Sequence, residues 1–148
     1  MDETLVHFKE SRYLSDDEKL KIRPHVTEFL ELLHPLYEFV VFTAASRMYA
    51  DFAIKKIDPA ERFLKHKLYR DSCKPMGRHM VKDLEIVVNL VNWERRFDNK
   101  ERVDISKLII VDNMVESFQL QPSNGIKIKD WYGNDYNDSC LLDLVPQL

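Results

Sequence analysis

Leu108-Ile109-Ile110-Val111-Asp112-Asn113 is an unbroken apolar run that ends in two polar residues. A second run of the same form, Phe39-Val40-Val41-Phe42-Thr43, lies earlier in the chain. Apolar runs without alternation are typical of strands covered on both faces, as in a parallel sheet between helices. Ligands bind beyond the carboxyl ends of such strands. The two runs therefore predict an α/β fold with a mainly parallel sheet flanked by helices, and a site near Thr43, Asp112 and Asn113.

Helical patterns alternate with these strands, as an α/β fold requires. A helix that opens at Arg23-Pro24 and ends before Pro35 is predicted, because proline is tolerated in a first turn and stops a helix later. The capped amphipathic tail predicts a helix over residues 138–145 with Asp138 as its N-cap. Another helix is predicted over residues 46–57, with one side formed by Met48, Tyr49, Phe52, Ala53 and Ile57.

The remaining segments carry weaker signals. Residues 10–22 are mixed and polar, which predicts a loop or a small flap, and residues 84–93 show no clear pattern. Residues 93–102 are rich in charge and indicate an exposed loop or a helix end. Strands are expected over residues 67–70, 107–111 and 126–128.

The composition excludes several classes of protein. A chain of 148 residues is one domain by length, and its net charge of −3 argues against a dedicated nucleic-acid binder. No apolar run approaches the ~20 residues of a membrane span, and no signal peptide is seen. Cys73 and Cys140 show no metal-ligand spacing, and neither do the histidines. Two reduced thiols in an intracellular protein, nuclear or cytoplasmic, are therefore expected.

Four short segments carry groups that phosphate-monoester hydrolysis needs: a proton donor, positive charge and ligands for Mg²⁺. Their order resembles that of the four motifs of the haloacid dehalogenase superfamily. Within it, the set resembles the NLI-interacting-factor-like phosphatases, which act on the C-terminal domain of RNA polymerase II. The four segments are Asp2-Glu3-Thr4, Thr43-Ala44-Ala45-Ser46, Lys82 and Asp112-Asn113, and the likeness extends to Tyr69–Cys73, Trp131 and Leu141–Leu144.

The resemblance implies a Rossmann-like fold and a role for each matching residue. It makes Asp2 the general acid/base, with its carbonyl on Mg²⁺, and Lys82 the group that neutralises the phosphoryl charge. Taken singly, Thr43 is a plain helix-capping hydroxyl and Arg70 a plain surface arginine. The implied sets are catalytic Asp2, Thr43, Lys82 and Asp112; substrate-binding Thr4, Ala44 and Arg70; and metal-binding Asp2, Asp112 and Asn113.

In the resembled family the first motif is Asp-x-Asp-x-Thr, and its first Asp attacks phosphorus. Met1 stands at the first x, so the attacking Asp would precede residue 1. We therefore expect a fold that lacks its first central strand, and a polypeptide that is inactive and unstable as a monomer. Three explanations stay open. In the first, the start of the gene is misassigned to an internal Met, and in the second, the polypeptide was made from such a misassigned start. In the third, the chain is a natural non-catalytic relative. The last would fill the gap by strand exchange or dimerisation.

Two departures from the family pattern bear on the substrate. Ala45 stands where Ser is frequent, and residues 86–104 are expected to be an insertion within a single domain over residues 1–148. Insertions near a site shape which peptide can enter it. The leading interpretation is a Mg²⁺-dependent protein serine/threonine phosphatase with an aspartyl-phosphate intermediate and a phosphoprotein substrate. The alternative is a non-catalytic binding or scaffold domain, such as that of a mitochondrial import component; a small-metabolite phosphatase is less favoured because no cap domain is visible.

Overall fold

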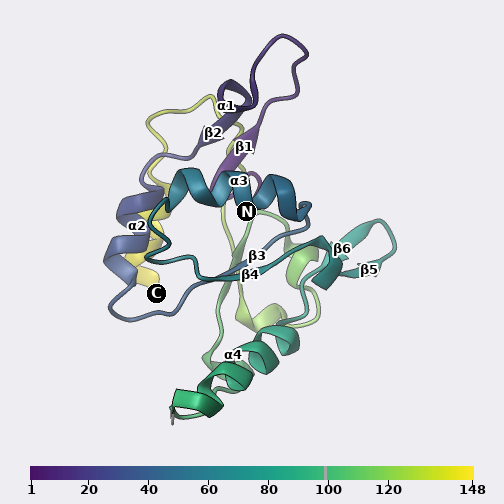
Figure 1. Ribbon diagram of the computed structural model, residues 1–148, viewed down its shortest axis with the longest axis vertical. Helices are drawn as coiled ribbons and strands as arrows, with labels where there is room; N and C mark the ends of the chain where they lie inside the picture. The colour runs from purple at the N-terminus through teal and green to yellow at the C-terminus, as the bar shows by residue number, and fades with distance from the viewer. Residues whose placement is uncertain (99) are drawn as a thin grey trace.

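The computed structural model describes residues 1–98 and 100–148, and its strands pair two by two (Figure 1). The antiparallel pairs are β1 (Val6–Phe8) with β2 (Leu20–Ile22) and β5 (Lys74–Met76) with β6 (His79–Val81). The parallel pairs are β3 (Val40–Phe42) with β4 (His66–Leu68) and β7 (Ile110–Asp112) with β8 (Gly125–Lys127). The helices are α1 (Asp16–Lys19), α2 (Val26–Leu33), α3 (Arg47–Ile57), α4 (Leu84–Asp98) and α5 (Cys140–Leu144).

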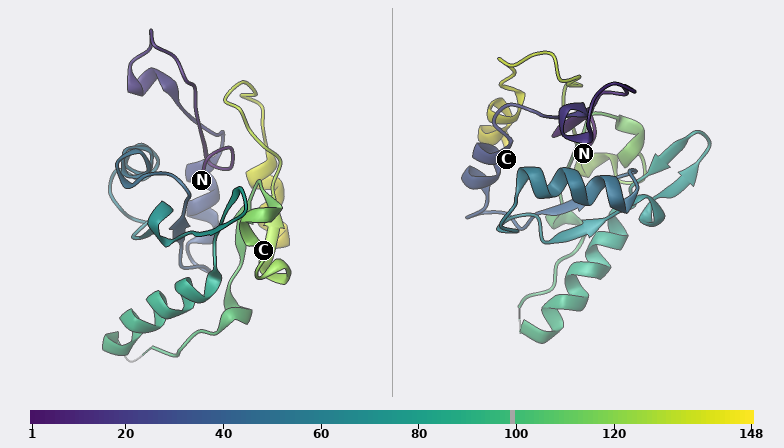
Figure 2. Two further views of the ribbon diagram at one scale, coloured as in Figure 1. Left: turned by 90° about the vertical axis from the view of Figure 1, so that its right-hand side faces the viewer. Right: turned by 45° about the horizontal axis from the view of Figure 1, so that its top comes forward.

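The α/β class is confirmed, and its two parallel pairs contain the two predicted apolar strands. Helix α3 connects β3 to its parallel neighbour β4, which is the usual crossover of a parallel sheet. Short 3₁₀ turns η1 (Arg70–Ser72), η2 (Ile105–Lys107), η3 (Val115–Phe118), η4 (Pro122–Asn124) and η5 (Val145–Gln147) complete the chain. The β1–β2 hairpin with α1 and the far end of α4 project from opposite ends of the molecule (Figure 2).

Two apolar clusters explain why the strand sequences do not alternate. On β3, Val41 packs in one cluster and Phe42 in the other. On β7, Val111 packs against the first cluster and Ile110 lies in the second. Successive side chains of a strand point to opposite faces, so both faces of these strands are covered by apolar residues.

An apolar cavity of about 220 Å³ lies between β3 and β7. Residues 38–42 and 107–112 line it without a break, together with Met1, α2 and α4 residues. Because side chains alternate between faces, an unbroken lining means that the strand edges border the cavity. Among the described strands, β3 pairs with β4 and β7 with β8, and the two do not pair with each other. The expected absence of a strand between them stays a prediction, and this cavity is the observation that supports it.

The cavity also bears on stability. Apolar side chains that border open space lack the packing partners that stabilise a core. Natural domains have a total stability of only about 5–15 kcal/mol. The instability of the isolated chain stays a prediction, and the open apolar space gives it a physical basis.

Helix α3 lies where it was predicted, but one residue of its predicted buried face was wrong. Met48 is 84% exposed, whereas the buried residues are Ala50, Ala53, Ile54 and Ile57. The pattern offers two apolar stripes, and packing selects the one with two alanines because small side chains let a helix approach its neighbours closely. Tyr49 and Phe52 pack at the margin of the core.

Residues 10–22 do not form the predicted loop throughout. Ser15 and Glu18 form a reciprocal capping box that starts α1, and β2 then pairs with β1. The Ser-x-x-Glu spacing of that box was a readable helix start. The flap is therefore a hairpin with one helical turn in its connection.

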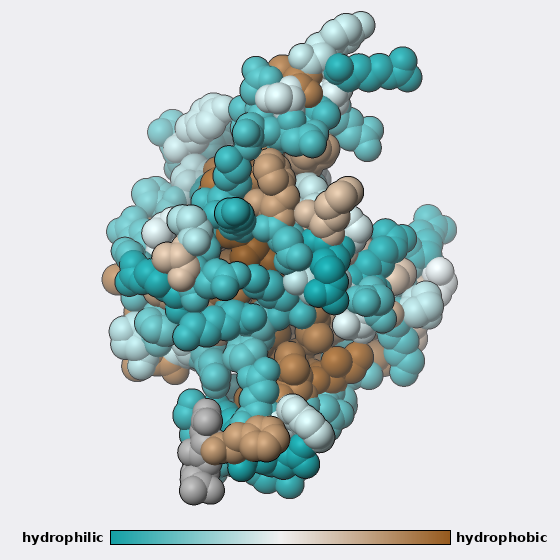
Figure 3. All heavy atoms as spheres, viewed as in Figure 1, coloured by the Kyte–Doolittle hydropathy of each residue, from teal (hydrophilic) through white to brown (hydrophobic). Residues whose placement is uncertain are grey.

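Residues 84–98 form α4, so the segment without a pattern is helical, and residues 93–98 are the helix end that was one of the two predictions for that segment. Leu84, Val87 and Val91 are buried at helical spacing, while Trp93 and Phe97 are exposed. In Figure 3, hydrophobic residues gather over the first half of α4. Asn99, within the predicted 93–102 segment, lies outside the described residues, and the insertion over 86–104 stays a prediction.

Several boundaries differ from the predicted ones. Strand β4 ends at Leu68 and Arg70 opens η1, and Lys107 belongs to η2 rather than to the second apolar strand. Helix α2 starts at Val26 after a left-handed N-cap, so Pro24 precedes it. Ser139, not Asp138, is the N-cap of α5. The Asp138 carboxylate still accepts the Cys140 backbone N–H at the start of α5, at 3.3 Å. It is also buried in an ion pair, a long-range demand that local pattern does not reveal.

Among residues 1–98 and 100–148, the structure contains no helix with the length and apolarity to cross a bilayer.

Candidate active site

Lys82 and Asp112 form a buried ion pair at the centre of the site. Lys82 follows β6, Asp112 ends β7, and their side chains are 6% and 3% exposed. Met114 donates its backbone N–H to the second carboxylate oxygen of Asp112 at 2.9 Å. Burial opposes the charge of Asp112 most strongly, but attraction to Lys82 and these hydrogen bonds keep its pKa below the usual value. A negative and a positive group are therefore held side by side away from water.

A second set of polar residues, Thr4, Asn113 and Asp130, lies beside this pair at the end of β7. The Thr4 hydroxyl donates to the side-chain oxygen of Asn113 at 3.3 Å, and the Asn113 amide donates to Asp130 at 2.7 Å. Thr4 itself is buried. Asp130 was not predicted as a site residue, although it follows the strand expected over residues 126–128. The rule that drew attention to Asp112, a polar residue after a strand, could have found it.

The Thr43 loop lies at the end of β3 and leads into α3. Thr43 is 1% exposed, and its hydroxyl accepts the backbone N–H of Ala45 at 3.1 Å. The N-cap of α3, Ser46, makes no side-chain capping bond. The first N–H groups of a helix that lack such a cap can bind an anion. The loop is thus suited to hold a phosphate group.

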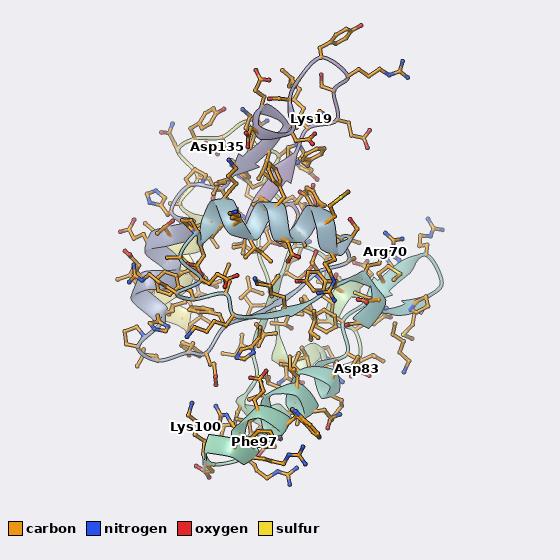
Figure 4. All side chains as sticks on the ribbon, in the orientation of Figure 1. Lys19, Arg70, Asp83, Phe97, Lys100 and Asp135 are labelled. Atoms are coloured by element: carbon orange, nitrogen blue, oxygen red, sulfur yellow. The ribbon has the colours of Figure 1, made fainter. Side chains whose placement is uncertain are left out.

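Arg70 is attached to the same loop. Its guanidinium donates to the Ala44 carbonyl at 3.5 Å, and its backbone N–H donates to the Ala45 carbonyl at 3.1 Å. The side chain is exposed beside the β5–β6 hairpin (Figure 4). Arg70 can therefore contribute positive charge at the open side of the loop.

Cys73 connects the Thr43 loop with the Lys82–Asp112 pair. Its thiol lies 3.6 Å from the Thr43 carbonyl. Burial raises the pKa of this thiol, and the nearby charges of Lys82 and Arg70 oppose that effect. The thiol was predicted to be reduced, and both Cys73 and Cys140 are free among the described residues.

Met1 and Asp2 lie beside the ion pair. Burial lowers the pKa of the Met1 ammonium to about 6, and the positive charge of Lys82 adds to the effect, while Asp112 and Asp2 act against it. The Tyr49 hydroxyl is buried near Asp2 without a hydrogen bond of ordinary geometry in the described part of the chain. Burial and the charge of Asp2 raise the pKa of this phenol. Tyr49 was predicted only as a packing residue.

The predicted site residues thus come together at the carboxyl ends of β3 and β7. The connections run from Thr4 to Asn113, from Lys82 to Asp112, and from Arg70 to Ala44. Asp2 joins them through Met1. The structure establishes their positions, and the roles assigned to them stay predictions.

The residues at this site have oxygen donors of the kind that Mg²⁺ takes. Mg²⁺ is usually held by one or two carboxylates and by waters and substrate oxygens, rather than by a full protein cage. Asp112, Asn113, Asp130 and the Asp2 carbonyl could supply such oxygens. Among the described residues, no cluster of three or more His, Cys, Asp or Glu is arranged around a metal position. The fit to Mg²⁺ therefore rests on the oxygen chemistry of these donors alone.

The fold defines an α/β domain of the haloacid dehalogenase type. The structure of Fcp1, an essential RNA polymerase II CTD phosphatase, superposes with a TM-score of 0.60 at 20% identity, over 88% of this chain and 40% of that one. The model of the NLI interacting factor-like phosphatases matches residues 1–148. The chain belongs to this family.

Curated relatives are identical to the chain at about a third of the aligned positions. The CTD nuclear envelope phosphatase 1B of Danio rerio is 35% identical over 126 residues, which are 85% of this chain and 45% of that protein. The human mitochondrial import inner membrane translocase subunit TIM50 is 35% identical over 126 residues, which are 85% of this chain and 31% of that protein. The chain thus spans less than half the length of these relatives.

Proposed function

We propose that this domain is a Mg²⁺-dependent phosphoserine/phosphothreonine protein phosphatase that works through an aspartyl-phosphate intermediate. The observation that carries the proposal is the buried Lys82–Asp112 pair beside the Thr43 loop. Charge and backbone donors fixed in advance are what phosphoryl transfer requires of a protein. When bound, Mg²⁺ would add positive charge against the phosphoryl oxygens, and Asp112 and Asn113 would hold it.

Each residue then has a defined task. The Thr43 loop and Arg70 bind the phosphoryl oxygens, and Lys82 neutralises their charge. An Asp carboxylate placed before Met1 attacks phosphorus, and the bond from phosphorus to the serine or threonine oxygen breaks. Asp2 gives that oxygen its proton, then takes a proton from the water that hydrolyses the aspartyl phosphate. The printed sequence has no carboxylate before Met1, so we propose little or no turnover for a polypeptide that begins there.

A phosphoprotein inside the cell, in the nucleus or the cytoplasm, is the proposed substrate. Arg70 is exposed at the Thr43 loop, so a phosphorylated side chain on a protein surface could approach it. Fcp1, whose fold the chain shares, is named as an RNA polymerase II CTD phosphatase, so a phosphopeptide of that domain is one substrate to test. Net charge gives no support for direct nucleic-acid binding.

The second candidate function is a non-catalytic binding domain. One observation favours it: the match to the human import subunit. Dimerisation or strand exchange through the cavity edges belongs to this proposal.

The test is to restore the strand. An apolar strand ending in Asp is placed directly before Met1, and hydrolysis of para-nitrophenyl phosphate and of a phosphoserine peptide is measured with and without Mg²⁺. Mg²⁺-dependent turnover that disappears when the added Asp is replaced by Asn supports the enzyme. A folded, extended polypeptide without turnover contradicts it, and peptide binding by that polypeptide then favours the binding domain. For the unextended chain, turnover that is lost in Asp2→Asn would contradict the proposed inactivity.

A further inference from the structure

Arg23 and Asp138 form an ion pair that is removed from solvent. Arg23 follows β2 and Asp138 precedes α5, 115 residues further on. The Arg23 Nε lies 2.7 Å from one Asp138 oxygen and Nη2 lies 2.9 Å from the other, and the side chains are 0% and 2% exposed. The two-point geometry fixes the orientation of the guanidinium.

The guanidinium has a third partner in the turn that follows Asp2. Its Nη1 donates to the Thr4 carbonyl at 3.0 Å, and the Arg23 backbone N–H donates to the Leu5 carbonyl at 2.9 Å. Within this turn Glu3 has a positive φ of 52°, a backbone angle that residues other than glycine rarely adopt. Strained backbone persists only where surrounding contacts determine it. Arg23 supplies two of those contacts.

Thr4 continues the connection toward β7. Its carbonyl accepts from Arg23, and its hydroxyl donates to Asn113, which in turn donates to Asp130. An unbroken series of polar contacts therefore runs from the start of α5 through Arg23 and Thr4 to the end of β7. Both acceptor and donor atoms of the Asn113 amide are engaged, so its orientation depends on this series.

We propose that Arg23 is a positioning residue, which acts through Thr4 to orient the side-chain oxygen of Asn113. The inference rests on the proposed function, in which Asn113 supports the Mg²⁺ position. A purely structural role explains the pair less well, because a buried ion pair gives little net stability over an apolar pair of similar volume. An apolar pair could not replace the hydrogen bond that Arg23 Nη1 donates to the Thr4 carbonyl.

The test uses the 148-residue chain, labelled with ¹⁵N, and follows the side-chain amide signals of Asn113. The Arg23→Met/Asp138→Leu variant removes both charges together. We expect it to stay folded while the two Asn113 amide signals move or broaden. The matched control is Arg62→Met, because Arg62 forms an exposed pair with Glu31 at 3.5 Å. Unchanged Asn113 signals in the folded double variant overturn the proposal.

Thr4 provides a second route that leaves the ion pair intact. Thr4→Val removes the hydroxyl donor and should reproduce the change in the Asn113 signals, whereas Thr4→Ser should restore them. If Thr4→Val leaves these signals as they are, the proposal fails even if the double variant cannot be studied.

Mg²⁺ titration separates this inference from the proposed function. Partners that orient a metal ligand change metal affinity by roughly 10-fold or more, so the Arg23 variant should bind Mg²⁺ about 10-fold more weakly. If the unsubstituted chain and the Arg23 variant both bind Mg²⁺ with equal affinity, Arg23 does not position the metal ligand. If the unsubstituted chain does not respond to Mg²⁺, the proposed metal site is what fails, and the Asn113 signals still decide the role of Arg23.

Discussion

The ammonium group of Lys82 and the carboxylate of Asp112 share an almost fully buried position between β6 and β7. Breaking such a pair from one side leaves an uncompensated charge without water, which costs about 3–5 kcal/mol. We therefore expect Lys82→Met to lower the free energy of unfolding by that amount in urea denaturation. Lys82→Met/Asp112→Leu should recover much of the loss, because no buried charge remains.

Lys56→Met is the control for this substitution. Lys56 pairs with Asp17 at 2.8 Å, but the two side chains are 47% and 65% exposed. Exposed pairs contribute about 0–1 kcal/mol. A Lys82→Met variant no less stable than Lys56→Met would contradict the buried position of the pair.

In a polypeptide that begins at Met1, the Met1 ammonium predicts a pH dependence of stability. Its pKa is about 6 in the folded chain against 8.0 for the exposed group, mainly because the group is buried. The unfolded chain binds more protons between these values, so stability should rise from pH 6 to pH 8 and fall on acidification. A difference of about 2 pKa units corresponds to about 3 kcal/mol.

Thermal or urea unfolding at a series of pH values measures this effect. An N-acetylated chain lacks the ammonium and is the matched comparison. The difference in stability between the acetylated and free chains should be largest at and below pH 6 and vanish above pH 8. A constant difference across this range would show that the amine is not buried.

The cavity between β3 and β7 predicts that an added strand stabilises the fold. Such a strand would cover the apolar lining and give backbone partners to the strand edges that border it. An extension of alternating Val and Leu before Met1 should therefore raise the urea midpoint strongly. The same extension with two central prolines should leave the urea midpoint unchanged, because proline has no backbone N–H to donate to a neighbouring strand. Equal midpoints for the two extensions would contradict insertion between the strands.

The apolar strands and the residues after them were predictable because their signals are local. Phe39–Thr43 and Leu108–Asn113 carry strand and site in one short stretch each, and the structure contains both strands. Helix α4 was missed because only Leu84, Val87 and Val91 face the core, while exposed Trp93 and Phe97 obscure the periodicity. Propensity and pattern are weak guides where exposed aromatics interrupt a stripe.

The contacts that hold the site were beyond sequence patterns. Arg23 and Asp138 are 115 residues apart, and each looks like an ordinary surface charge in its own segment. The cost of burying either one appears only when the fold brings them together. The family resemblance supplied Asp2, Lys82 and Asn113 as site residues. The structure adds Asp130, which follows a predicted strand, and Tyr49, for which the chain gave little local signal.

Arg70 should contribute to substrate binding without contributing to stability. Its side chain is exposed and makes one long contact, to the Ala44 carbonyl at 3.5 Å. Hydrogen bonds to a charged partner are worth about 1.5–3 kcal/mol, which corresponds to roughly 10- to 100-fold in affinity. In the strand-restored polypeptide, Arg70→Ala should raise KM for a phosphoserine peptide by that factor and change the urea midpoint little.

Arg78→Ala is the matched control, since Arg78 is also exposed but lies at the turn between β5 and β6. A general loss of surface charge would change both variants alike, and more so at low salt, because screening acts on exposed charges over about 10 Å. A specific phosphate contact changes only Arg70→Ala. Equal KM values for the two variants would therefore remove Arg70 from the phosphate site, and a lower urea midpoint for Arg70→Ala would assign it to holding the Thr43 loop instead.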